Sequence, residues 1–160
     1  MENKQQIYDE LTAQLDALME GESEEMSVLA NVSAALAERF PWFWTGFYLE
    51  REGELRLGPF QGTVACMHIA HGRGVCGTAF ERRQSIVVPD VEQFPGHIAC
   101  SSLSRSEIVV PMFLPDEEDG HGEVWGVIDI DSTELGTFDE VDAEYLERIA
   151  TMLSRCASHC

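Results

Sequence analysis

The sequence predicts an α+β domain in which helices pack on a central antiparallel sheet. The expected elements run in the order helix, helix, strands, helix, strands, helix, without the strand–helix–strand alternation of parallel sheets. The chain has 160 residues, the size of one domain with a single core, so we expect one domain over 1–160. Its hydrophobic fraction of 44% is ordinary for a globular chain.

Two helices are expected to open the chain. Apolar residues recur at helical spacing over 5–20, and Gly21 suits the end of that helix. A second helix is predicted over 24–39, with Ser23 as its N-cap. Pro41 cannot continue a helix, so the chain must change conformation there.

A β-hairpin is expected next. Aromatic and β-favouring residues dominate 43–49, and apolar and charged side chains alternate over 54–57. Pro59 and Gly62 are expected to end the return strand. The stretch 66–69 is predicted to be short and extended, and it leads into a glycine-bearing loop.

The second half is expected to complete the sheet and close with a helix. Pro111 indicates that its strand lies at an edge or contains a bulge. Thr137 and Glu140 have the spacing of a capping box. The predicted elements are a helix over 75–83, a strand over 85–88, a long loop over 90–104, a strand over 107–114, an acidic turn over 115–122, a strand over 123–132 and a helix over 138–157.

Charge and composition limit the partners and the compartment. The net charge of -19 repels nucleic acid and anionic membrane surfaces, although solubility alone explains such a charge. No apolar run approaches the about 20 residues that span a bilayer. The N-terminus has no apolar secretory segment, so we expect a cytoplasmic protein with reduced thiols. The odd number of five cysteines argues against a fully paired disulfide framework.

Three cysteines, Cys66, Cys76 and Cys100, lie in one stretch. Their spacing is too wide for the paired ligands of a structural zinc site. A closer set stands at the C-terminus, which we expect to fray: Cys156, His159 and Cys160. We therefore predict no metal site and no cofactor. A single buried cysteine is more often a small hydrophobic residue, so inert and redox roles both remain open.

The glycine-bearing helix start at 74–77 can bind an anion. The first backbone N–H groups of a helix are free and attract negative charge, such as a ligand carboxylate. An ordinary tight turn is the alternative. Cys76 lies in the first helical turn, where a helix N-terminus lowers the pKa of a thiol. Cys100 lies in the long loop, and loops commonly contain functional residues.

Two aspartates continue an apolar face of the strand over 123–132. By the two-residue period, Asp129 and Asp131 lie on the same face as Trp125 and Val127. Glu107 begins the preceding strand and could reach the same end of the sheet. Three converging carboxyl groups would hold a cation, and their repulsion would raise one pKa so that a protonated acid remains. A solvated strand end is the alternative.

Five segments resemble the free methionine-(R)-sulfoxide reductases, which are proteins of the GAF fold. The resemblance covers about residues 5–155 and implies a central antiparallel sheet of about six strands with helices on its faces. The segments are G-P-F-Q-G-x-x-A-C (58–66), G-R-G-V-C-G-T-A (72–79), G-H-I-A-C (96–100), S-E-I-V-x-P (106–111) and G-V-I-D-I-D-S (126–132).

The resemblance also implies a reaction and a partner. Cys100 would attack the sulfur of free methionine-(R)-sulfoxide and become a sulfenic acid. Cys66 would then form a disulfide with it, with Cys76 as an auxiliary or alternative resolving thiol. Thioredoxin would restore the thiols by exchange. A homodimer is implied as well.

The pocket residues follow from the same resemblance. Glu107, Asp129 and Asp131 would jointly hold the ammonium and polarise the sulfoxide oxygen, with Glu107 and Asp131 taking part in catalysis. Trp44 would pack on the S-methyl group beside Tyr48. Backbone groups at the helix start would hold the carboxylate: Gly74, Val75 and Cys76. The alternative function is a non-catalytic GAF module that binds a small ligand or senses redox state.

Overall fold

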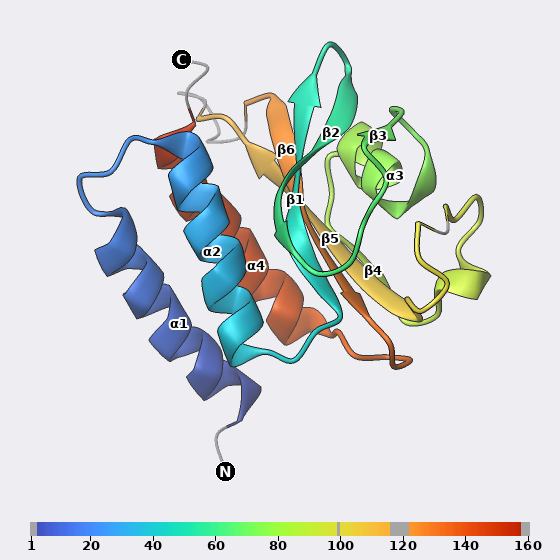
Figure 1. Ribbon diagram of the computed structural model, residues 1–160, viewed down its shortest axis with the longest axis horizontal. Coiled ribbons are helices and arrows are strands. Elements are labelled where there is room, and N and C mark those ends of the chain that lie inside the picture. Colours follow the sequence, from blue (N-terminus) through green and yellow to red (C-terminus); the bar gives the residue numbers. More distant parts are fainter. Residues whose placement is uncertain (1–2, 99, 116–121, 158–160) are drawn as a thin grey trace.

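The structure is a computed structural model that describes residues 3–98, 100–115 and 122–157 (Figure 1). Its strands are β1 (Trp44–Arg51), β2 (Glu54–Gln61), β3 (His68–Ile69), β4 (Ile86–Val88), β5 (Ser106–Phe113) and β6 (Val124–Ser132). They form one sheet in the order β3-β2-β1-β6-β5-β4, and every neighbouring pair is antiparallel. The predicted α+β class and six-stranded antiparallel sheet are confirmed.

Helices cover the two faces of the sheet unequally. The helices are α1 (Lys4–Met19), α2 (Glu25–Arg39), α3 (Gly74–Arg82) and α4 (Glu140–Leu153), with 3-10 turns η1 (Val91–Gln93) and η2 (Ser154–Cys156). Helices α1, α2 and α4 pack on one face, and α3 lies on the opposite face (Figure 1). Within the described ranges, none of these helices has the length and apolar character needed to cross a membrane.

Two helix caps differ from the prediction. α4 is capped by Asp139, whose carboxylate accepts from the N–H groups of Val141 and Asp142, while the Asp142 side chain accepts from the Asp139 N–H. Carboxylates are strong acceptors for free helix N–H groups, and Thr137 instead donates to Ser132. The predicted Ser23 cap of α2 is also wrong, because Glu24 takes the N-cap position without a side-chain bond.

Two prolines occupy strand positions where the lack of a backbone N–H removes little of the hydrogen bonding of the sheet. Pro59 does not end β2 as predicted, because it lies where the β1–β2 register shifts and the strand continues to Gln61. Pro111 lies beyond the stretch of β5 that β4 pairs with, so the strand is locally an edge there. The sequence predicts an edge strand or a bulge at Pro111; β5 is an inner strand that lies between β6 and β4, and only its part beyond β4 is unpaired on one side.

A β-bulge moves Trp125 to the other face of β6. The β5–β6 register shifts between Met112 and Phe113, so that Trp125 is inserted between paired residues. Trp125 therefore joins Ile128 in the helix-covered core, whereas Asp129 faces the opposite side. The prediction that Trp125 shares the face of the aspartates is wrong for this reason.

Candidate active site

A pocket lies on the α3 face of the sheet. It encloses about 560 Å³ of space outside protein atoms, including its mouth. Strands β1, β5 and β6 supply its floor, α3 supplies one wall, and the loops that follow β2 and η1 form the rim. Its lining includes Trp44, Tyr48, Arg73, Gly74, Val75, Cys76, His97, Cys100, Glu107, Asp129 and Asp131. The fold thus brings to one pocket every site residue that the sequence predicts except Cys66, which is disulfide-bonded to Cys100 at its rim.

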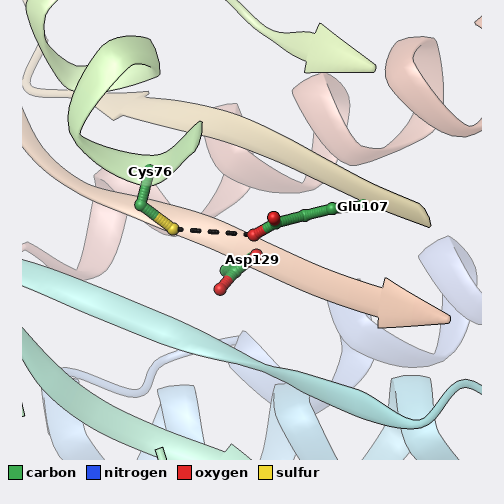
Figure 2. A group of neighbouring side chains, drawn as sticks. All are labelled: Cys76, Glu107 and Asp129. Atoms are coloured by element: carbon green, nitrogen blue, oxygen red, sulfur yellow. Dashed lines mark hydrogen bonds between the residues drawn. The ribbon is translucent and has the colours of Figure 1, made fainter. Parts of the chain in front are cut away.

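Sheet register brings the three carboxyl groups together. Glu107 on β5 is directly opposite Asp131 on β6, and Asp129 lies two residues away on the same face of β6. Glu107 and Asp129 are each only 6% exposed, and Asp131 is half-buried. Cys76 of α3 points at this group, and its thiol donates a long hydrogen bond to Glu107 Oε2 at 4.0 Å (Figure 2).

Burial raises the pKa of all three carboxyl groups. For Glu107, desolvation raises the pKa well above its usual value, and the nearby Asp129 and Asp131 add to that shift. Asp131 shows the same direction for the same two reasons, desolvation and then the charge of Asp129. For Asp129, desolvation also raises the pKa, and hydrogen bonds from Glu107 and Cys76 oppose the shift. The predicted protonated acid therefore has a structural basis in this group.

Cys76 is not the acidic thiol that its helix position predicts. Burial raises its pKa well above the usual value, and the charges of Asp129 and Glu107 raise it further. The thiol is 4% exposed. Desolvation and like charge thus outweigh the effect of the helix N-terminus on this thiol. The prediction that Cys76 has a lowered pKa is wrong.

A disulfide joins Cys66 and Cys100 across the pocket rim, with their Cα atoms 5.6 Å apart. It connects the loop that follows β2 to the loop that precedes β5, and both half-cystines are half-buried. This is the pair that the family resemblance implies. Cys76 remains a free thiol deeper in the pocket.

Two aromatic residues of β1 hold the loop that contains Cys66. The Tyr48 hydroxyl donates to the Cys66 carbonyl at 2.8 Å, and Trp44 Nε1 donates to the Thr63 carbonyl at 3.0 Å. Gly62 (φ 144°) passes so close to the indole of Trp44 that a Cβ would come within 2.5 Å of it. Trp44 and Tyr48 therefore line the pocket and also position the loop.

Two further pocket residues were not singled out from the sequence. His97 faces Asp129 from the η1–β5 loop, and partial burial lowers its pKa while the Asp129 charge opposes that shift. Its place in the G-H-I-A-C segment was an available signal. Arg73 lies at the exposed N-cap of α3 and adds a positive charge at the mouth. Nothing in the periodicity of the sequence predicts which side of the pocket Arg73 faces.

Cys156 does not belong to the pocket. Cys156 is buried between α4 and the α1–α2 connection, where its thiol donates to the Glu22 carbonyl. His159 and Cys160 lie outside the described residues, as does most of the acidic turn predicted over 115–122.

Comparisons with known proteins agree with this geometry. The GAF domain family model matches residues 7–156. "GAF domain-containing protein A" of Dictyostelium discoideum is 51% identical over 152 residues, covering 94% of this chain and 92% of that protein. The free methionine-R-sulfoxide reductase of Escherichia coli K12 is 44% identical over 154 residues, covering 96% and 90%.

A solved structure is similar over the same span. It is the free methionine-R-sulfoxide reductase of Neisseria meningitidis in complex with its substrate, with a TM-score of 0.91 and 46% identity, covering 98% of this chain and 91% of that one. The fold, the pocket and these similarities together place the protein: the chain belongs to the GAF domain family, in the group of the free methionine-R-sulfoxide reductases.

Proposed function

We propose that this protein reduces free L-methionine-(R)-sulfoxide to methionine. The observation that supports this best is the Cys66–Cys100 disulfide at the rim of a pocket whose floor holds the buried carboxyl groups of Glu107 and Asp129. A redox-active thiol pair beside a proton donor is what sulfoxide reduction requires. Relatives at 44% and 46% identity are named for this activity.

The charges of the pocket suit a free amino acid. The pocket is lined both by the three carboxyl groups and by the N-terminus of α3 with Arg73. We propose that Asp129, Asp131 and Glu107 hold the substrate ammonium and polarise the sulfoxide oxygen. Free N–H groups of the first α3 turn would hold the substrate carboxylate: Gly74, Val75 and Cys76. The S-methyl group would pack on Trp44.

The chemistry then proceeds in balanced steps. The Cys100 thiolate attacks the sulfoxide sulfur while a protonated carboxyl group, Glu107 or Asp131, gives its proton to the oxygen. The oxygen is transferred to Cys100, methionine leaves, and Cys100 becomes a sulfenic acid. The Cys66 thiol then attacks Cys100, the new S–S bond forms and water is lost. Cys76 would serve as an auxiliary resolving thiol.

Turnover requires an external dithiol. Exchange with thioredoxin would return both cysteines to thiols and oxidise thioredoxin. Since this step needs a reducing thiol pool, we place the activity in the cytoplasm. We also propose that the active form is a homodimer of single GAF domains spanning 1–160, which light scattering on the purified protein would test.

A stereospecific assay tests the proposed function. With dithiothreitol as reductant, the R epimer of free methionine sulfoxide should be consumed and the S epimer left. N-acetylated methionine-(R)-sulfoxide should be a very poor substrate, because the acetyl group removes the ammonium that the carboxyl groups would hold. Equal consumption of both epimers, or of the acetylated form, would overturn the assignment. Reversible disulfide formation without methionine production would favour a redox-sensing module instead.

Cysteine variants separate the two thiol roles. Cys100→Ser should release no methionine in a single turnover, since the attacking sulfur is absent. Cys66→Ser should still release about one equivalent, because attack by Cys100 precedes disulfide formation. Cys100 should then accumulate as a sulfenic acid, except where the auxiliary thiol Cys76 resolves it. Methionine can be measured by chromatography, and the sulfenic acid by dimedone labelling and mass spectrometry. A full equivalent from Cys100→Ser would contradict the assignment.

A further inference from the structure

Three side chains of metal-ligand type converge at the base of the pocket (Figure 2). The Cys76 sulfur and one carboxylate oxygen each of Glu107 and Asp129 lie within 4.8 Å of one another, and the Cys76–Glu107 separation is 4.0 Å. All three residues are buried and line the pocket, so an ion could reach them from its mouth. They come from three different elements, α3, β5 and β6.

A second observation points to a missing ligand. Asp129 accepts hydrogen bonds from Glu107 and Cys76, yet one of its oxygens, Oδ1, is buried and has no hydrogen-bond partner. A buried carboxylate oxygen without a partner costs free energy, and a bound ion or water is one way in which such an oxygen is satisfied. The substrate ammonium of the proposed function would satisfy this oxygen during turnover. The adjoining thiol of Cys76 is a soft sulfur ligand for a metal ion, and an ammonium group does not need it.

We propose that this protein binds one thiophilic divalent cation of the Zn²⁺ class at Cys76, Glu107 and Asp129. A tetrahedral zinc ion with Zn–S about 2.3 Å and Zn–O about 2.0 Å separates such donors by about 3.5 Å. For Cys76 and Glu107, closing the 4.0 Å separation to this geometry requires a movement of about half an ångström in total. Water from the pocket mouth supplies the fourth position. The sulfur ligand disfavours Mg²⁺ and Ca²⁺, which take oxygen ligands.

The bound cation has a consequence for the proposed activity, and this part rests on that function. It occupies the carboxylates that hold the substrate ammonium, so metal and substrate exclude each other. The reductase is therefore inhibited by zinc, competitively with the sulfoxide. Neither Cys66 nor Cys100 is needed as a metal ligand, because the site is complete while they are joined in the disulfide.

The test uses the disulfide form, in which Cys66 and Cys100 cannot bind a metal. A background variant, Cys156→Ala with Cys160→Ala, removes the other thiols, so Cys76 is the single free cysteine. Co²⁺ is titrated as a spectroscopic probe and then displaced by Zn²⁺. We expect one equivalent of Co²⁺ with a sulfur-to-cobalt charge-transfer band, and loss of that band when Zn²⁺ is added.

Two substitutions in that background locate the site. Cys76→Ser should abolish the charge-transfer band, and Asp129→Asn should weaken binding at least about tenfold, the loss that even an outer-shell partner can cause. Thermal unfolding shows whether each variant is folded. Absence of saturable binding to the background protein would overturn the proposal. A band retained in Cys76→Ser, or an unchanged affinity in Asp129→Asn, would overturn it equally.

The binding test is independent of the proposed reaction, because it involves no substrate. Free methionine-(R)-sulfoxide is added in a separate arm and should weaken the apparent Co²⁺ affinity in proportion to its concentration. If one equivalent of Co²⁺ binds and the sulfoxide does not change its affinity, the competition is refuted and the proposed metal site stands. If the metal-free protein consumes no sulfoxide in the stereospecific assay while the disulfide form still binds one equivalent of Co²⁺, the proposed function is refuted and the metal site stands.

Discussion

At the scale of single residues, the pocket is defined by acids whose pKa values are raised by burial. Glu107 is 6% exposed and lies beside two aspartates, so desolvation and like charge both raise its pKa. A group of this kind costs stability whenever it must ionise inside the fold. A buried carboxyl group retained at such a cost is a functional-site candidate, since perturbed pKa values cluster where catalysis needs them.

Glu107→Gln should therefore stabilise the protein while it abolishes activity. The folded-state pKa of Glu107 is raised, so its cost is absent below the unfolded value of about 4.3 and grows as pH rises toward the folded value. The variant should match the wild type near pH 4. Its free energy of unfolding should exceed the wild type's at pH 8, and the difference should grow as the pH rises above the unfolded pKa.

Denaturant unfolding at both pH values measures this difference. The matched control is Glu123→Gln, which neutralises an exposed glutamate next to β6 and should change stability by less than about 0.5 kcal/mol at either pH. The raised pKa would be contradicted if the difference in unfolding free energy, Glu107→Gln minus wild type, were smaller at pH 8 than at pH 4.

At the scale of elements, β1 positions the loop over 62–67 that contains Cys66. Tyr48 and Trp44 donate hydrogen bonds to two of its carbonyls, and the loop passes directly against the indole ring. Resolution of a sulfenic acid requires that the second sulfur reach the first, so the position of this loop should govern that step. Strand and loop thus act as one unit.

Tyr48→Phe tests this coupling, because it keeps the ring and removes only the bond to the Cys66 carbonyl. A neutral hydrogen bond contributes about 0.5–1.5 kcal/mol, so the rate of disulfide formation relative to methionine release should fall about two- to tenfold. Rapid quench with dimedone labelling gives both rates from one experiment. An unchanged ratio of the two rates would show that the bond does not position Cys66.

At the scale of the whole molecule, the first and last helices are joined by a buried carboxylate. Asp142 of α4 is fully buried, accepts from the Tyr8 hydroxyl at 2.6 Å and pairs with Lys4 at 2.6 Å. Tyr8 and Lys4 belong to α1, more than 130 residues away in the chain. Charge-assisted hydrogen bonds as well as apolar packing therefore hold α1 and α4 together in the helical layer that supports the sheet.

Tyr8→Phe should destabilise the fold by about 1–3 kcal/mol, because it leaves a buried carboxylate oxygen without its donor. Activity per folded molecule should be unchanged, since the pocket lies across the sheet. The control is Arg148→Ala, which breaks an exposed pair with Glu144 and should cost less than about 0.5 kcal/mol. Guanidinium unfolding compares the two; equal losses would contradict the role given to Asp142.

Local patterns in the sequence determined the order and type of the elements. Helical periodicity, aromatic strand runs and turn residues act over a few neighbours, so α1, β1 and β6 end within about two residues of their predicted bounds. The family resemblance likewise indicated the pair Cys66 and Cys100, which the structure joins. The caps were less predictable, because Asp139 and Thr137 compete for the same helix end.

Only the tertiary structure decided which side chains face one another and which are desolvated by burial. A bulge whose register depends on β5 moved Trp125 away from the aspartates. Burial against Asp129 and Glu107 raised the pKa of Cys76, which the helix position alone predicts to fall. Desolvation and through-space charge depend on residues far apart in the chain, so neither could be read from local spacing. For the same reason the grouping of Cys76, Glu107 and Asp129 emerged only from the fold.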